Sequence, residues 1–204
     1  MYKKPVIVFE GIEGSGKTFY SKIVSNYLKK RNISHIKMRE PGGSINSEKI
    51  RKLILNNKSN FTKNTDLLLY LAARSENISF LTQSFKKKII LIDRFTDSTI
   101  AYQHFGMGVE LSIIKKINKF LLNSFNVDFT FLNVVNKKNM KERLNRRKSL
   151  NRYDKFNENF YQKVQKGFLK LAKKKGNSYM IIDSNLPIKI NKKLVLDKIE
   201  KLIK

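Results

Sequence analysis

The sequence predicts an α/β fold in which a five-stranded parallel sheet is covered by helices on both faces. Short apolar runs alternate along the 204 residues with longer segments of helical periodicity, as parallel strands joined by helices require. Three runs, VIVF, IILI and YMII, carry apolar or aromatic side chains at every position, which is typical of strands buried on both sides. No repeat or Pro/Ser-rich linker divides the chain, so we expect one domain over residues 1–204.

The expected elements follow one another in a regular order. The first strand, at residues 6–9, runs into a glycine-rich turn, and Phe19, Ile23 and Tyr27 then share one helical face. Apolar runs predict further strands at 33–38, 89–92, 129–135 and 179–182. Helical spacing predicts helices at 19–30, 48–55, 66–80, 111–125, 140–148, 157–175 and 192–203. Residues 137–156 are dense in charge and poor in apolar side chains, so we expect a mobile excursion within the same domain.

The composition excludes several classes of protein. The chain has no Cys, which rules out disulfides, thiolate metal sites and a cysteine nucleophile. The two histidines, His35 and His104, argue against a His-rich metal site and a Ser-His-Asp triad. No apolar run approaches the roughly 20 residues that span a bilayer. The apolar stretch after MYKK is shorter than the core of a signal peptide. We therefore expect a cytoplasmic protein with no membrane partner.

The net charge of +27 raises the question of a polyanionic partner such as nucleic acid. The alternative is a compositional bias, since Lys, Asn and Ile are abundant and Trp is absent. The lysines are spread along the whole chain, which favours the bias. Only nine of the 43 basic residues are arginine, and Lys does not replace a bidentate Arg clamp on phosphate. The positions of the arginines are therefore informative.

One octapeptide carries a recognisable chemistry. It fits the P-loop pattern GxxxxGK[ST], with a buried strand before it and an amphipathic helix after it, and comprises Gly11, Ile12, Glu13, Gly14, Ser15, Gly16, Lys17 and Thr18. Glycines let successive backbone N–H groups surround phosphate oxygens, and the helix N-terminus adds partial positive charge. We expect Lys17 to reach the β- and γ-phosphates and the Thr18 hydroxyl to bind Mg²⁺. The predicted fold is thus that of a P-loop NTPase.

A second pair of charged residues follows the third predicted strand. An acid at this place, such as Asp93, holds the water shell of Mg²⁺ in many P-loop proteins. Arg94 beside it is a candidate clamp for an acceptor phosphate. The alternative is that Asp93 only caps the next turn.

Three segments together resemble bacterial thymidylate kinases: FEGIEGSGKT (9–18), REPGGS (39–44) and DRFTDSTIAYQ (93–103). The resemblance spans nearly the whole chain, and the second and third segments are more specific than a P-loop. It implies transfer of a phosphoryl group from ATP to dTMP with Mg²⁺, in a homodimer. It also implies a short mobile LID, which we place at about 137–156, and a monophosphate-binding region at about 39–78.

The resemblance assigns roles to individual residues. Glu13 matches an acid near the sugar and phosphates. The acceptor phosphate and the nucleoside are assigned to positions in three segments of the chain: Arg39, Glu40, Arg51, Tyr70, Arg74, Arg94, Ser98, Thr99, Tyr102 and Gln103. Among these, Tyr70 matches a ring that stacks on thymine, where Phe is commoner, and Tyr102 matches a residue packed against the deoxyribose. For each position, ordinary packing or a surface charge is the alternative.

The LID resemblance assigns an arginine to the transferring phosphoryl group, because the P-loop itself contains none. Arg143, Arg146 and Arg147 lie at i, i+3 and i+4, so a helix would present them together, with Met140 and Leu144 on its apolar side. We select Arg147 and Arg152 as catalytic candidates, beside Lys17, Arg94 and Glu13.

We therefore expect a dTMP kinase that uses ATP and Mg²⁺ and has no specific nucleic-acid partner. Two alternatives stay open. The chain could phosphorylate another nucleotide or a nucleoside, or it could be a basic P-loop protein that binds nucleic acid.

Overall fold

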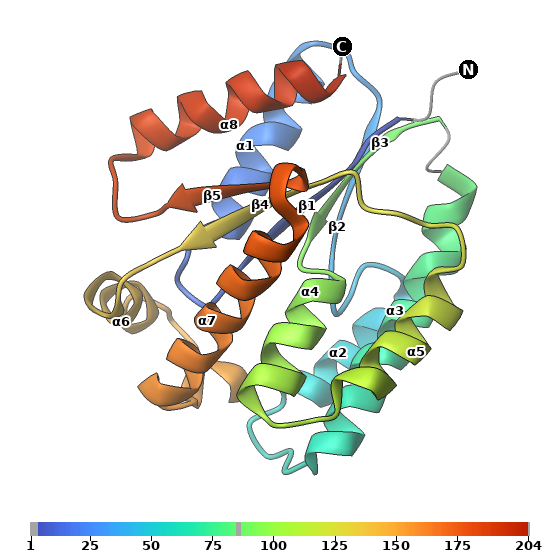
Figure 1. Ribbon diagram of the computed structural model, residues 1–204, viewed down its shortest axis with the longest axis vertical. Coiled ribbons are helices and arrows are strands. Elements are labelled where there is room, and N and C mark those ends of the chain that lie inside the picture. The colour runs from blue at the N-terminus through green and yellow to red at the C-terminus, as the bar shows by residue number, and fades with distance from the viewer. Residues whose placement is uncertain (1–3, 85–86, 204) are drawn as a thin grey trace.

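The computed structural model describes residues 4–84 and 87–203 and confirms the predicted α/β fold (Figure 1). The ends of the expected domain, residues 1–3 and 204, and residues 85–86 lie outside this description. Five parallel strands form one sheet in the order β2-β3-β1-β4-β5. Their bounds are β1 (Val6–Gly11), β2 (His35–Arg39), β3 (Ile89–Asp93), β4 (Phe129–Val134) and β5 (Tyr179–Asp183).

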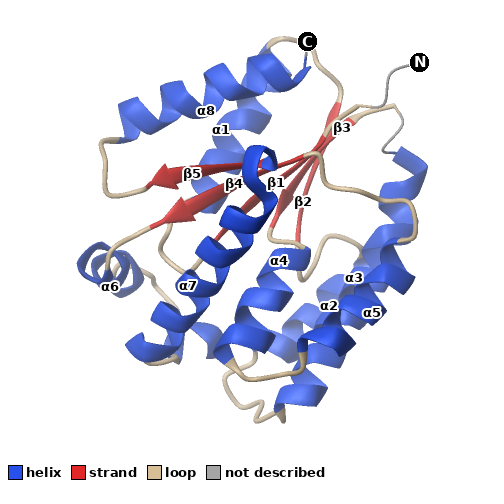
Figure 2. Ribbon diagram, viewed as in Figure 1, coloured by secondary structure: helices blue, strands red, loops and turns tan. Residues whose placement is uncertain are grey.

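Helices cover both faces of the sheet (Figure 2). On one face, α1 (Lys17–Lys30) and α8 (Ile188–Ile203) pack through Val24, Leu28, Val195 and Ile199 against alternate residues of β1, β3 and β4. The other face is covered mainly by α3 (Lys63–Ser84) and α7 (Glu158–Lys175), with α2 (Ile45–Leu55) and α5 (Leu111–Leu122) packed farther out. β1, β3 and most of β4 are buried. The prediction that YMII is buried on both sides is wrong, because β5 lies at the edge of the sheet and Ile181 is 51% exposed. None of the helices in the described ranges is long and apolar enough to cross a bilayer.

Most helices differ from the predicted bounds only at their ends. α1 begins at Lys17 and α3 at Lys63, where the Thr62 hydroxyl accepts a hydrogen bond from the Thr65 amide. A cap of this kind starts a helix before its apolar stripe begins. The prediction of a helix to residue 148 is wrong at its C-terminal end, because α6 (Lys137–Asn145) stops earlier. Arg146 and Arg147 therefore follow the helix, and the expected cluster of three arginines on one helix face does not form.

The segment after β3 contains a helix of unusual type. The short α4 (Thr96–Thr99) continues into a π-helix, η1 (Ile100–Gly106), which packs against α7. A side chain at Gly167 of α7 would place its Cβ 2.5 Å from Phe105 Cδ2, so only glycine permits this close crossing. After α6, the chain forms a loop and a 3₁₀ turn, η2 (Arg152–Lys155); a second such turn, η3 (Gly176–Ser178), precedes β5.

The carboxyl ends of the central strands meet at one edge of the sheet. Phe9 of β1 and Arg39 of β2 both lie in register with Asp93 of β3. The P-loop after β1 and the Asp93–Arg94 pair are thus brought together. In open parallel sheets, ligands bind at this edge.

Candidate active site

The P-loop joins β1 to α1 and has the backbone that its glycines predict. Gly11 has φ 142°, and a Cβ there would lie 2.4 Å from the Asn133 carbonyl oxygen, so another residue would not fit. Gly14 and Gly16 also have positive φ, 71° and 88°, at the N-terminus of α1. The amide groups of this loop therefore curl around a small space at the positive end of a helix, an arrangement that suits phosphate.

Two side-chain oxygens lie together where the start of α1 meets the end of β3. The Thr18 hydroxyl of α1 donates a hydrogen bond of 2.5 Å to the Asp93 carboxylate of β3. No cluster of three or more histidine, cysteine or acidic residues in the described ranges could hold a metal on its own. A hydroxyl and one carboxylate nevertheless suit Mg²⁺, which keeps several waters and takes further ligands from phosphates.

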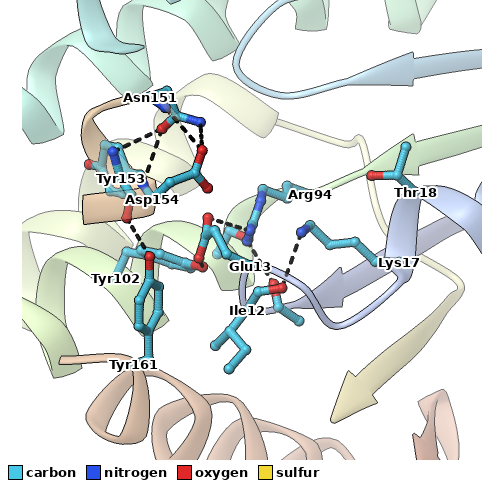
Figure 3. A network of polar contacts seen from close by, with 12 residues as sticks. Ile12, Glu13, Lys17, Thr18, Arg94, Tyr102, Asn151, Tyr153, Asp154 and Tyr161 are labelled. Atoms are coloured by element: carbon cyan, nitrogen blue, oxygen red, sulfur yellow. Dashed lines mark hydrogen bonds and ion pairs between the residues drawn. The ribbon is translucent and has the colours of Figure 1, made fainter. Parts of the chain in front are cut away.

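A buried network joins the P-loop to the segment after β3 (Figure 3). Arg94 donates to the carboxylate of Glu13 and to the carbonyl of Gly11, both at 2.8 Å, and the Tyr102 hydroxyl donates to the other oxygen of Glu13. Arg94 holds this position with a left-handed backbone, φ 70°, which is rare for a residue with a side chain. Strain of this kind persists where the surrounding structure enforces it, as at functional sites.

The network perturbs the charged groups around the loop. Burial alone would raise the pKa of Glu13, but Arg94, Lys17 and the Tyr102 hydroxyl outweigh it and lower that pKa. Burial and the nearby Arg94 lower the pKa of Lys17 to about 8. Lys17 Nζ contacts the Ile12 carbonyl at 3.3 Å. Two cations thus lie close together, and an anionic ligand between them would relieve their repulsion.

Two adjoining pockets open beside the P-loop. The first collects eight of the ten residues predicted to bind the acceptor: Glu40, Tyr70, Arg74, Arg94, Ser98, Thr99, Tyr102 and Gln103. The remaining two, Arg39 and Arg51, line the second pocket, together with Lys17, Thr18, Asp93 and Arg147. Glu13, Arg94 and Tyr70 border both pockets. The structure therefore brings the predicted donor and acceptor residues to one connected space.

Several of these side chains are held by protein groups. Arg74 is only 1% exposed and pairs with Glu40 at 2.8 Å, while its Nη1 donates to Asn118 Oδ1 at 2.8 Å. Burial raises the pKa of Glu40 although Arg74 opposes it. Arg74 is thus a buried, fixed donor rather than a surface charge. The Thr99 hydroxyl, also buried, has no hydrogen-bond partner among the described residues and remains available to a ligand.

The other two predicted acceptor arginines, Arg51 and Arg39, differ in how firmly they are held. Arg51 donates to the Pro41 carbonyl at 2.7 Å, and burial together with the nearby Arg39 lowers its pKa. The Arg39 side chain is 54% exposed and pairs with Glu48 at 3.1 Å.

The two LID arginines selected as catalytic candidates lie in different places. Arg147 lines the pocket that holds Lys17 and pairs with Asp154. Arg152 pairs with Asp66 on α3, donates to the Ile54 carbonyl at 3.0 Å and borders a different hollow. The structure thus places only one of the two selected arginines beside the P-loop.

Sequence reasoning missed several residues of the site. Arg143 is one of the four LID arginines, but its contact with the P-loop is not predicted. It donates to the carbonyls of Gly14 at 2.9 Å and Ser184 at 2.6 Å, so it joins the P-loop to the segment after β5. Tyr153 lines both pockets, and Asn151 and Asp154 line the second. No local pattern reveals the contacts of Arg143, because its partners lie far away in the sequence. Asn151 and Asp154, by contrast, form a local capping box, and their spacing is a signal that the sequence carries.

The fold and this site define a P-loop nucleotide-binding protein with a second, acceptor pocket beside the phosphate loop. Comparison with known proteins then gives the family. The chain belongs to the thymidylate kinase family, whose model matches residues 9–195.

Individual relatives support this assignment. The chain is 37% identical over 177 residues to the thymidylate kinase of Thermosipho africanus, covering 86% of this chain and 88% of the relative. It is 41% identical over 170 residues to the thymidylate kinase of Wolbachia pipientis wMel, covering 81% and 84%. Among solved structures, the thymidylate kinase of Ehrlichia chaffeensis superposes with a TM-score of 0.77 at 30% identity, covering 98% of this chain and 99% of that one.

Proposed function

We propose that this chain transfers the γ-phosphoryl group of ATP to dTMP, giving ADP and dTDP, with Mg²⁺. The observation that carries the proposal is the single pocket that gathers eight of the ten predicted acceptor residues directly beside the P-loop. Membership of the thymidylate kinase family supports the same reaction. We propose further that the chain acts as a homodimer in the cytoplasm.

On the donor side, the P-loop amides and Lys17 bind the phosphates of ATP. Thr18 and Asp93, whose side-chain oxygens lie 2.5 Å apart, would hold Mg²⁺. The bound ion would neutralise part of the charge of the phosphates. Lys17 is buried and its charge is destabilised by Arg94, so we expect it to bind the triphosphate strongly.

On the acceptor side, the proposal assigns Arg94, Arg51 and Arg39 to the monophosphate. The acceptor is already an oxyanion, so no general base is required; the protein must hold two anions in line and cancel their repulsion. Glu13 accepts from the 3′-hydroxyl of the sugar in this scheme. Tyr102 packs on the deoxyribose where a 2′-hydroxyl would otherwise fit.

The base lies in the deeper part of the first pocket. Tyr70 stacks on thymine, while Arg74, Ser98, Thr99 and Gln103 offer polar groups to its edge. The unpartnered Thr99 hydroxyl supports this assignment, since a buried polar group without a partner is costly unless a ligand supplies one. Glu40 fixes Arg74 through their buried ion pair.

We assign the transferring phosphoryl group to Arg147, because it is the LID arginine that lines the pocket containing Lys17. Arg152 supports the site from its ion pair with Asp66. Closure of the segment 137–156 over the nucleotides would exclude water and suppress hydrolysis of ATP.

The decisive experiment measures ADP release from Mg-ATP with dTMP, dUMP, dCMP, dGMP, AMP and thymidine as acceptors. The proposal expects dTMP to exceed all others. Turnover that is fastest with a different acceptor would discard the base assignments and leave the P-loop roles. Absence of any acceptor-dependent turnover in a chain that binds ATP would favour the nucleic-acid alternative. Steeply salt-dependent binding of DNA would then be the test.

A further inference from the structure

A buried carboxylate outside the phosphate site organises the polar end of the acceptor pocket. Asp66 lies in the first turn of α3 and is 1% exposed. Three side chains from other segments converge on it: Gln103 of η1 and Arg152 and Tyr153 of η2. No motif in the sequence assigns a role to Asp66, which lies on a different helix from Gln103.

Only one assignment of donors and acceptors is consistent with the hydrogen bonds around Asp66. A carboxylate paired with a guanidinium accepts hydrogen bonds and cannot donate them. The Tyr153 hydroxyl therefore donates its single hydrogen to Asp66 and can only accept from Gln103. Gln103 Nε2 donates both of its hydrogens, to Asp66 at 3.2 Å and to the Tyr153 hydroxyl at 3.1 Å.

Because both amide hydrogens are engaged by Asp66 and Tyr153, the carbonyl oxygen is the part of the Gln103 amide left to meet a ligand, as far as the described residues show. Gln103 itself lines the acceptor pocket and is 1% exposed, so its amide has little access to bulk water. If the Gln103 amide rotated by half a turn, its oxygen would face the Asp66 carboxylate and the lone pairs of the Tyr153 hydroxyl, whose hydrogen points to Asp66. Repulsion between these oxygens in a buried site would oppose that rotation.

We propose that Asp66 is a positioning residue that fixes the Gln103 amide with its oxygen toward the base, so that the pocket selects pyrimidines carrying a hydrogen on N3. Thymine and uracil donate from N3, whereas cytosine presents a lone pair there and would meet the Gln103 oxygen unfavourably. This inference rests on the proposed function and deepens it, since it names which residue sets the polarity of base recognition.

Arg152 completes the arrangement by balancing the buried charge of Asp66. Its guanidinium also donates to the Ile54 carbonyl at 3.0 Å and lies over the Phe61 ring, with 15% of the side chain exposed. Arg152 and Tyr153 are consecutive in η2, within the segment expected to close over the nucleotides. Asp66 thus links that segment to the residue that reads the base.

The test is the specificity of Asp66→Asn, measured as kcat/KM for dTMP, dUMP and dCMP. The side-chain amide introduced by this substitution can donate to the Gln103 oxygen, which frees the Gln103 amide to turn and to offer a hydrogen to cytosine N3. We expect the ratio of dTMP to dCMP to fall about tenfold, chiefly through KM. The ratio of dTMP to dUMP should stay within about twofold, because both bases carry the N3 hydrogen. Loss of stability alone would lower all three values together and leave both ratios unchanged.

Asp97→Asn provides a matched control. Asp97 is also a buried carboxylate that pairs with a cation, Lys175 at 2.7 Å, and accepts from a tyrosine hydroxyl, that of Tyr179. Its partners are thus on α7 and β5, away from the Gln103 amide, so the dTMP-to-dCMP ratio should remain that of the wild type.

Tyr153→Phe is the second variant if Asp66→Asn does not fold. It keeps the ring and removes only the hydroxyl that bridges Gln103 and Asp66, and we expect the same ratio to fall about threefold. If Asp66→Asn folds and keeps the wild-type ratio of dTMP to dCMP, the inference is overturned. If Asp66→Asn does not fold, a wild-type ratio in Tyr153→Phe overturns it instead. In both cases, dTMP turnover by the wild type would still uphold the proposed function. A wild-type enzyme that turns over dCMP as well as dTMP also overturns it. Absence of dTMP turnover in the wild type refutes the proposed function itself.

Discussion

The buried Glu10 makes the stability of this protein depend on pH in a predictable direction. Glu10 lies near the end of β1 and accepts from the amides of Phe95 and Ser98 at 2.8 and 3.1 Å and from the Ser98 hydroxyl at 2.5 Å. Burial, with a contribution from Asp97, raises its pKa from 4.5 to about 7. The difference corresponds to about 3 kcal/mol of preference for the protonated form in the folded state.

The direction in which stability changes with pH follows from the difference in proton binding between the folded and unfolded chains. Between pH 4.5 and 7 the folded chain binds a proton at Glu10 more tightly than the unfolded chain does. This contribution to stability is therefore fully present below about pH 4.5 and is lost as the pH rises through about 7. Gln cannot ionise, so Glu10→Gln removes the dependence. The free energy of unfolding of the wild type, relative to the variant, should fall by about 2–3 kcal/mol between about pH 5 and 8.

The assay is urea unfolding of both proteins at a series of pH values, followed by far-UV circular dichroism. The exposed Glu76, which contacts Asn46, provides a control: Glu76→Gln should keep the pH slope of the wild type. Equal slopes in the wild type and Glu10→Gln would refute the reasoning, because they would show that Glu10 titrates alike in the folded and unfolded chains.

Three further substitutions test the site. Arg74→Ala leaves Glu40 buried without its partner, so we expect a loss of about 3–5 kcal/mol in urea unfolding. In the molecules that remain folded, dTMP should bind more weakly in calorimetric titration while ATP binds nearly as before; equal loss of both would contradict the base-reading role. Arg147→Ala should lower kcat about a hundredfold or more, while alanine at the exposed neighbour Arg146 leaves it within about threefold; similar values for the two would exclude the assigned role of Arg147. Gly11→Ala should abolish ATP binding in fluorescent-nucleotide titration, because the new Cβ would lie 2.4 Å from a carbonyl oxygen; tight binding would disprove that the loop is rigid there.

The parts of the fold that depend on local patterns were predictable from the sequence. The VIVF and IILI runs became the buried β1 and β3. Helical spacing predicted α1, but the face that this helix buries carries Tyr20, Val24 and Leu28, whereas Phe19 is 45% exposed. The P-loop backbone was predictable from its glycines, which are also a local signal. The pocket residues became predictable only through the resemblance of three motifs.

The remaining features depend on contacts between distant segments. Nothing in the residues around Arg152 indicates that it pairs with Asp66, and nothing around Arg147 indicates that it stays beside Lys17. The choice between the two arginines is made by tertiary packing. The π-helix η1 was likewise hidden, since its widened turn is maintained by packing against α7 rather than by a local signal.

The edge-to-face contacts of Tyr153 with Tyr70 and Tyr102, each at 5.8 Å between ring centroids, give the protein a built-in optical reporter. The chain contains no tryptophan and only eight tyrosines, so no indole emission masks their fluorescence. Three of the eight border the acceptor pocket. A nucleobase stacked among these rings should quench a large share of the total tyrosine emission, so ligand binding could be followed in the unlabelled protein.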